Sequence, residues 1–304
     1  MLAEQPRQCS RADAALAPPE TLAAGEALFN SPALLGGQAA KAELSCAACH
    51  RNGRANPHFL MPQLSGAPGT ADVTSSFFGP RRGNGRFDPV AIPDLAMPGK
   101  VSRTPENPDL ARFIRNLVVE EFSGAEPSPA MLDALAAYVR TIGACPADDD
   151  KAQPRRLADQ LWLIDQMLAG ARATGSDAML RRQLVAAARH QLGLIDERYA
   201  SVRHAGLRRD LLAASRDLAR IGDGNADGAG WRGGLEKWHA RFTARLVPRL
   251  RQQEAASRYD HAELRRALGH AASPPHGPAI LLRRSTASVR GAAFRGALRA
   301  APFH

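Results

Sequence analysis

Two cysteines and a histidine form the strongest chemical motif of this 304-residue chain. The motif reads Cys-Ala-Ala-Cys-His, with thiols at Cys46 and Cys49 and an imidazole at His50. On a helical turn both thiols emerge on the same side, where each can add to one vinyl group of a haem. The adjacent His50 then reaches the iron as an axial ligand. The motif therefore predicts the covalent attachment of one haem.

Two other chemistries use a similar motif. The cysteine pair is also the pattern of a redox dithiol, and it is half of a zinc site that is followed by a chance histidine. A zinc site would need a second pair of ligands at short spacing, and the two remaining cysteines, Cys9 and Cys145, are isolated in the sequence. Haem attachment is the favoured interpretation.

Around this motif, residues 20–143 resemble the c-type cytochrome family. In that family a glycine and an aromatic residue of an N-terminal helix cross against an aromatic residue of a C-terminal helix. Gly25, Phe29 and Tyr138 look like that set, although an ordinary helical core would use the same residues. The resemblance implies an all-α, cytochrome c-like haem domain at residues 20–145, with one covalent haem c and electron transfer as its function.

The resemblance also implies how His50 is oriented. Residues 62–66 read Pro-Gln-Leu-Ser-Gly, which is similar to the Pro-x-Leu-x-Gly turn of the family. In that turn the proline carbonyl accepts a hydrogen bond from the haem histidine, so Pro62 is expected to orient His50 and to raise its basicity as a ligand. The alternative is a simple surface turn.

The sixth iron ligand is expected from a residue further along the chain. Met97 lies in a proline-rich loop that is similar to the loops supplying the distal methionine in bacterial cytochromes c. His58, or an open coordination position, remains an alternative. Met61 is set aside because it adjoins Pro62 and would face the wrong side of the ring, and Met131 because it opens the C-terminal helix.

One feature departs from compact carriers. Sixteen residues separate Phe29 from Cys46, and this long approach resembles the haem domains of bacterial di-haem cytochrome c peroxidases. The chain has one Cys-x-x-Cys-His motif, and a two-haem peroxidase stores an oxidising equivalent on each centre. An electron carrier is therefore favoured. A peroxidase-like haem enzyme is the first alternative, and a haem-based sensor or interaction protein is the second.

Two further helices are expected in the first half. Residues 109–122 are expected to form a helix that is an insertion packed beside the haem, and the C-terminal helix is expected to have Ser128 as its N-cap and Pro129 as its first residue. Cys9 and Cys145 flank the unit, and a disulfide between them is one expectation, against free thiols or a lipid-modified Cys9. Haem attachment of this kind implies export to an oxidising periplasm, where a disulfide is stable. Residues 1–20 nevertheless show no apolar signal core.

The second half reads as a separate helical unit. After an N-terminal extension at 1–19 and the haem domain at 20–145, residues 146–154 read as a linker. Apolar stripes of helical period then predict a helical bundle or a set of hairpins at 155–270. Residues 271–304 are expected to be a disordered tail. No apolar run approaches the ~20 residues of a membrane-spanning helix.

Charge divides the chain in the same place. Residues 1–145 carry 13 basic and 14 acidic side chains, whereas residues 146–304 carry 27 and 16. The basic half predicts an acidic redox partner rather than specific nucleic-acid binding, because it lacks the relevant motifs.

The acidic loop at 223–228 copies the start of a calcium loop but lacks the final glutamate. The histidines of this half are expected to be solvated or capping, and its tryptophans to be core anchors: His190, His204, His239 and His261; Trp162, Trp231 and Trp238.

Overall fold

The fold of the described chain is helical. The computed structural model describes residues 4–11, 17–74, 78, 84–105, 107–147, 151–174, 177–223 and 228–271. Its strands in this part are two-residue segments that pair antiparallel, β1 with β4 and β2 with β3: β1 Glu4–Gln5, β2 Thr70–Ala71, β3 Val90–Ala91 and β4 Gln153–Pro154. The expected all-α class is confirmed. No helix of the described residues has both the length and the apolar composition needed to cross a membrane.

The first half contains two long helices and several short ones. The helical segments are α1 Pro19–Phe29, α2 Pro32–Leu35, α3 Gly37–Lys41, α4 Cys46–Cys49, η1 Arg51–Gly53, α5 Asp109–Asn116, η2 Leu117–Glu121 and α6 Pro129–Thr141. The expected helix at 109–122 is present as α5 and the π-helical turn η2. Ser128 caps α6, because its side chain accepts a hydrogen bond from the backbone N–H of Met131.

The second half is a series of antiparallel helices, as expected. Its segments are α7 Leu157–Ala173, α8 Ala178–Arg198, η4 Val202–His204, α9 Ala205–Asp223, α10 Gly228–Arg241, η5 Phe242–Leu246, α11 Val247–Gln252, η6 Glu254–Ala256 and α12 His261–Ala271. The predicted apolar stripes are buried, including Leu157 and Ile164 of α7 and Leu235 of α10. Asp177 starts α8 by accepting a hydrogen bond from the N–H of Leu180.

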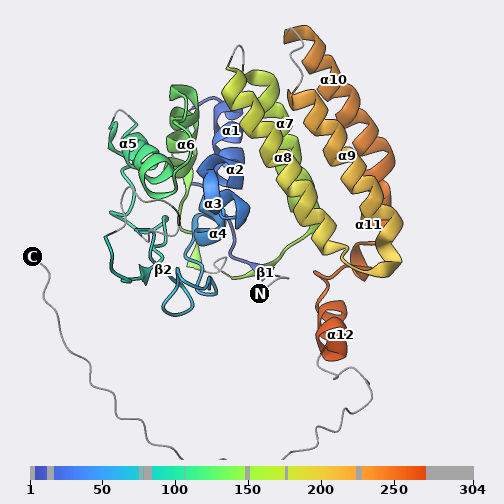
Figure 1. Cartoon of the computed structure of the whole chain (residues 1–304), viewed down its shortest axis with the longest axis horizontal. Coiled ribbons are helices and arrows are strands. Elements are labelled where there is room, and N and C mark those ends of the chain that lie inside the picture. The colour runs from blue at the N-terminus through green and yellow to red at the C-terminus, as the bar shows by residue number, and fades with distance from the viewer. Residues whose placement is uncertain are drawn as a thin grey trace, which may run out of the picture.

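The two halves share one hydrophobic core. Figure 1 shows the long helices side by side, with α1 between α6 and α7, and with α8, α9 and α10 following across the molecule. Buried side chains form one continuous cluster from Leu28 of α1 through Leu168 of α7 to Trp238 of α10. The boundary near residue 146, visible in charge and composition, is therefore not a gap in the packing.

The crossing of α1 and α6 has the expected geometry. A Cβ added to Gly25 would lie 2.0 Å from the carbonyl oxygen of Ala134 and 2.6 Å from Cβ of Tyr138. The rings of Phe29 and Tyr138 meet edge to face, with 5.3 Å between their centroids. The two backbones can approach this closely because Gly25 has no side chain.

A strap formed by residues 4–11 ties the two halves together. Cys9 forms a disulfide with Cys145, which confirms the expected pairing. Beside it, the N–H of Gly143 donates to the carbonyl of Cys9 at 2.9 Å. At the start of the strap, β1 pairs with β4, so residues 153–154 of the predicted linker are held as a strand where the chain enters the second half.

Several expectations need correction, and others concern residues outside the described part of the chain. Trp231 and Trp238 are buried core residues, whereas Trp162 is 48% exposed and is not a core anchor. His204 is buried rather than solvated, and His239 lies 2.8 Å from the Asp165 carboxylate. The predicted tail beyond residue 271 and residues 224–227 of the acidic loop lie outside the described residues.

Candidate functional site

Cys46, Cys49 and His50 lie together on one helical turn. The short helix α4 consists of the four residues Cys46–Cys49, and His50 follows as its C-cap. The N–H of His50 donates to the carbonyl of Cys46 at 2.8 Å, and the side-chain amide of Asn56 donates to the carbonyl of Ala48 at 2.9 Å. Both thiols are free, partly buried and packed against the hydrophobic core. The turn therefore presents two sulfurs, neither of them in a disulfide, to the hydrophobic core.

A proline carbonyl orients His50, but it does not belong to the predicted proline. Nδ1 of His50 lies 3.0 Å from the carbonyl oxygen of Pro93. Pro62, expected in this role, is exposed in a local turn in which the N–H groups of Leu64 and Ser65 both donate to the carbonyl of Met61. The expectation for Pro62 is therefore wrong for the described structure.

Contacts from neighbouring residues hold Pro93 in place. The N–H of Leu95 donates to the carbonyl of Gly53 at 3.0 Å. The guanidinium of Arg54 and the carboxylate of Asp94 form an ion pair at 2.7 Å. These contacts clamp the segment around Pro93 against the residues that follow His50, which is why the Pro93 carbonyl reaches the ring.

The environment of His50 favours a neutral ring. Burial lowers the pKa of His50, and this effect outweighs the Pro93 hydrogen bond and the nearby Asp94 charge. A carbonyl oxygen only accepts hydrogen bonds, so the ring proton belongs on Nδ1. The lone pair of Nε2 is then available to a metal.

The thiol environment argues against the two competing chemistries. Burial raises the pKa of Cys46 to about 11 and that of Cys49 to about 12. Redox dithiols instead have lowered thiol pKa values, because the thiolate is the reactive form. Cys9 and Cys145 are joined to each other, and the described residues contain no group of three or more metal-ligating side chains. Neither a redox dithiol nor a zinc site fits this arrangement.

The candidates for a sixth ligand occupy different environments. Met97 is 53% exposed on a turn closed by its N–H and the carbonyl of Asp94, just after Pro93. Met131 is only 2% exposed and belongs to the core of α6. His58 is exposed, and Met61 is partly buried against the core. Met61 was set aside because it adjoins Pro62, and since Pro62 does not contact the ring, Met61 is again an alternative to Met97.

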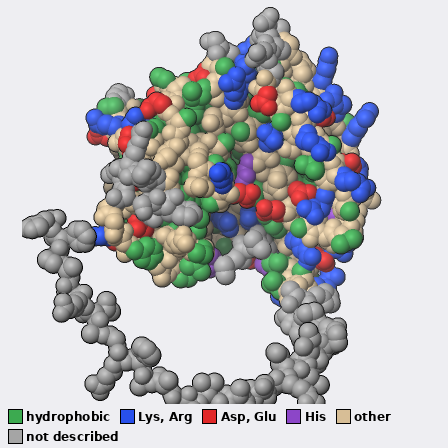
Figure 2. All heavy atoms as spheres, viewed as in Figure 1, with side chains coloured by type: hydrophobic (Ala, Val, Ile, Leu, Met, Phe, Trp, Pro, Cys, Tyr) green, Lys and Arg blue, Asp and Glu red, His purple; other side chains and the backbone are tan. Residues whose placement is uncertain are grey.

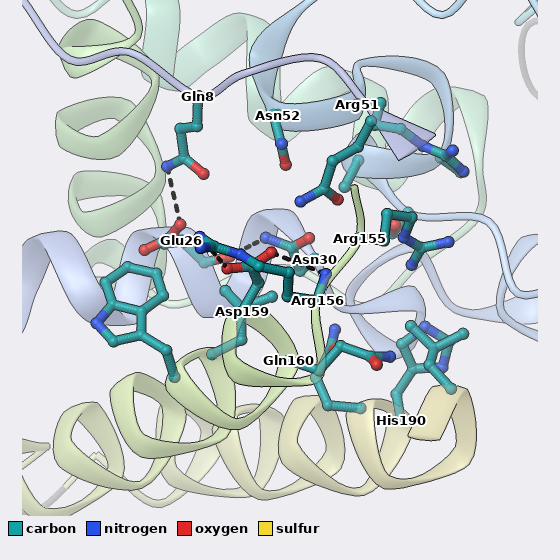
Figure 3. A pocket seen from close by; sticks show the side chains of 18 of the residues that line it. Gln8, Glu26, Asn30, Arg51, Asn52, Arg155, Arg156, Asp159, Gln160 and His190 are labelled. Carbon is teal, nitrogen blue, oxygen red and sulfur yellow. Dashed lines mark hydrogen bonds and ion pairs between the residues drawn. The ribbon is translucent and has the colours of Figure 1, made fainter. Parts of the chain in front are cut away.

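A cavity of about 460 Å³ lies behind α4, between the two halves. The first half contributes Ser45, Ala47 and Ala48, and the second half contributes residues of α7 and α8. Figure 3 shows its charged lining, with Glu26 and Gln8 at one end and Arg51, Arg155 and His190 at the other. This cavity was not predicted from the sequence. A local signal for it is the acidic residue Glu26, which follows Gly25 in an otherwise apolar stretch of α1.

Comparison with known proteins found no matching family model, no similar curated protein and no similar solved structure. The residues of the chain and their geometry therefore carry the functional interpretation.

Proposed function

We propose that this protein is an exported c-type cytochrome that carries one covalently attached haem and transfers electrons. The observation that carries the proposal is the α4 turn, which presents two free thiols and a histidine whose ring is already oriented. A haem bound there supplies reversible one-electron chemistry.

Each residue of the turn has a defined part in this proposal. The Cys46 and Cys49 sulfurs form thioether bonds to the porphyrin, and Nε2 of His50 binds the iron. The Pro93 carbonyl fixes the ring orientation and makes the imidazole a more basic ligand. Met97 remains the proposed sixth ligand, and a thioether there would favour ferrous iron and raise the potential.

Apolar packing supports this use. Cys46 and Cys49 pack against the hydrophobic core, and the loops that follow α4 contribute buried side chains to that core: Phe59, Leu64, Ala71, Ile92 and Val101. Apolar surroundings of this kind would limit solvent access to a bound haem. Other apolar side chains of these loops are exposed, including Leu60, Phe87 and Val90.

The basic second half supports an acidic redox partner. Figure 2 shows lysine and arginine side chains gathered on the part of the visible face that covers the helical half. The exposed arginines of α9 to α11 include Arg208, Arg209, Arg216, Arg220, Arg241, Arg249 and Arg251. Some of this charge is balanced locally, as in the Arg208–Asp196 pair. The excess would steer an acidic partner during encounter.

The Cys9–Cys145 disulfide supports a periplasmic location. Disulfides persist in oxidising compartments and are rare in the reducing cytosol. Covalent haem attachment belongs to the same export compartment in bacteria, so the two modifications are mutually consistent.

The test is production in cells that have haem-maturation machinery. We expect a coloured protein whose mass exceeds that of the polypeptide by one haem. Replacing both Cys46 and Cys49 by serine should abolish covalent haem. Replacing Cys9 and Cys145 by serine is the matched control, and it should leave haem attached. A colourless wild-type protein of unmodified mass would sink the proposal, and rapid turnover of peroxide would favour the peroxidase-like alternative.

A further inference from the structure

Glu26 is a buried acid that the attachment site does not use. It lies on α1 next to Gly25 and is 5% exposed. Its Oε1 accepts a hydrogen bond from the side-chain amide of Gln8 at 2.9 Å. The same amide lies 3.2 Å from the hydroxyl of Tyr138. An acid in such a position is costly to ionise, because its hydrogen-bond donor is an uncharged amide.

Glu26 lies close to the back of the haem-attachment turn. It lines the same cavity as Ser45, Ala47 and Ala48, which surround the two cysteines in the sequence. Burial raises the pKa of Tyr138, and nearby Glu26 and Cys46 raise it further, so each of these two side chains lies near the Tyr138 hydroxyl. The cavity connects Glu26 to polar side chains of both halves, which offers a route for a proton from solvent.

Burial raises the pKa of Glu26 to about 7, and the Gln8 hydrogen bond lowers it by a smaller amount. The carboxyl group is therefore poised to gain or lose a proton near neutral pH. Cys46 and Tyr138 lie on the elements beside it, and the other titratable or charged side chains that line the cavity are Glu43, Arg51, Arg155, Arg156, Asp159, His190, Glu197 and Tyr259. Arg156 and Asp159 form an ion pair with each other.

We propose that Glu26 takes up a proton when a haem attached to Cys46 and Cys49 takes up an electron. This inference rests on the proposed function. The electron comes from the redox donor, the proton comes from solvent through the cavity, and it binds a carboxylate oxygen of Glu26. On oxidation the electron goes to the acceptor and the proton returns to solvent.

The coupling follows from charge. Reduction removes one positive charge from the iron centre, and in a buried site this strengthens the binding of a proton to a nearby carboxylate. Electron uptake and proton uptake therefore favour each other, and linkage makes the effect reciprocal. On average, each electron that the protein carries would then be accompanied by less than one proton.

The measurement is the midpoint potential of the haem-loaded full chain as a function of pH, by spectroelectrochemistry. The wild-type potential should fall as pH rises through the neutral range. The total fall is about 59 mV for each tenfold difference in proton affinity between the two redox states. Glu26→Gln keeps a side chain that can bond to Gln8 but cannot titrate, so this fall should disappear.

Two matched variants serve as controls. Glu20→Gln removes an exposed acid from the same helix and should leave the fall unchanged. His190→Gln removes the other titratable side chain of the cavity whose ordinary pKa is near neutral, and it should also retain the fall. A fall that persists in Glu26→Gln, or that disappears only in His190→Gln, overturns the proposal.

Gln8→Ala provides a second variant that leaves Glu26 in place. Because the Gln8 hydrogen bond lowers the pKa of Glu26, its removal should move the fall in potential to higher pH. An unshifted pH range in a haem-loaded Gln8→Ala protein contradicts the proposal even if Glu26→Gln fails to mature. A colourless wild-type protein instead contradicts the proposed function, so the two failures are distinguishable.

Discussion

At the scale of single residues, the orientation of His50 depends on a carbonyl 43 residues away. Pro93 reaches the ring because the backbone bond from Leu95 to Gly53 and the Arg54–Asp94 ion pair hold its segment. Substituting Asp94 would therefore disturb the imidazole indirectly. Because Pro62 does not contact the His50 ring, it no longer places the neighbouring Met61 on the His50 side of the haem.

The sixth ligand can be assigned by a pair of conservative variants. We expect Met97→Leu to lose the weak near-infrared absorption of thioether-ligated ferric haem and to lower the midpoint potential, because a thioether favours ferrous iron. Met61→Leu should retain both properties. The reverse pattern would assign Met61 as the ligand, and retention of the absorption by both variants would exclude both methionines.

Among the helices, α1 packs against both halves of the molecule. Gly25 and Phe29 contact α6, and on another side α1 packs against α7. Glu26 directs its carboxyl group to Gln8 in the cavity between the halves. A shift of α1 would therefore disturb the aromatic crossing, the cavity and the attachment turn together.

Gly25→Ala tests the close crossing of α1 and α6. The new methyl group would lie 2.0 Å from a backbone oxygen of Ala134, which cannot move without displacing α6. Overpacking of this kind costs about 1–3 kcal/mol of unfolding free energy. Urea denaturation of the haem-loaded protein measures it.

The matched control is Gly193→Ala in α8, where the added Cβ has no atom within 4 Å. Alanine favours helix over glycine, so this variant should gain roughly 0.5–1 kcal/mol. Equal stability of the two variants would mean that the α1–α6 crossing is looser than the structure indicates.

At the scale of the whole molecule, the strap at residues 4–11 joins parts that are distant in sequence. It pairs with β4 at the entrance to the second half, accepts a 2.7 Å hydrogen bond from Asn52 at Pro6, and carries the Gln8 amide to Glu26. The Cys9–Cys145 disulfide anchors its far end. The strap thus links stability of the whole fold to the environment of the cavity.

Removing the disulfide tests this role. Replacing Cys9 and Cys145 by serine should lower the unfolding free energy by about 2–5 kcal/mol, because the bond limits the unfolded chain across 136 residues. Denaturation with and without a reductant measures it. Reductant should destabilise the wild-type protein and leave the double variant unaffected, whereas equal sensitivity of the two proteins would contradict the prediction.

Local features could be predicted from the order of residues along the chain. Apolar periodicity predicted α7 to α10, the Ser128 cap predicted the start of α6, and the spacing of Cys46, Cys49 and His50 predicted their shared turn. These features depend on residues within a few positions of one another, so their physics can be followed along the chain. The Gly25 crossing was found because the resemblance supplied its distant partner.

Three features depend on long-range packing and could not be predicted from the sequence. They are the proline carbonyl that lies against His50, the single core that the two halves share, and the position of Glu26 in the cavity behind the attachment turn. A proline carbonyl has no side-chain signature, so Pro62 and Pro93 are indistinguishable until long-range hydrogen bonds place one against the ring. Likewise, the proton affinity of a glutamate is set by burial, which results from packing of helices that are far apart in the sequence.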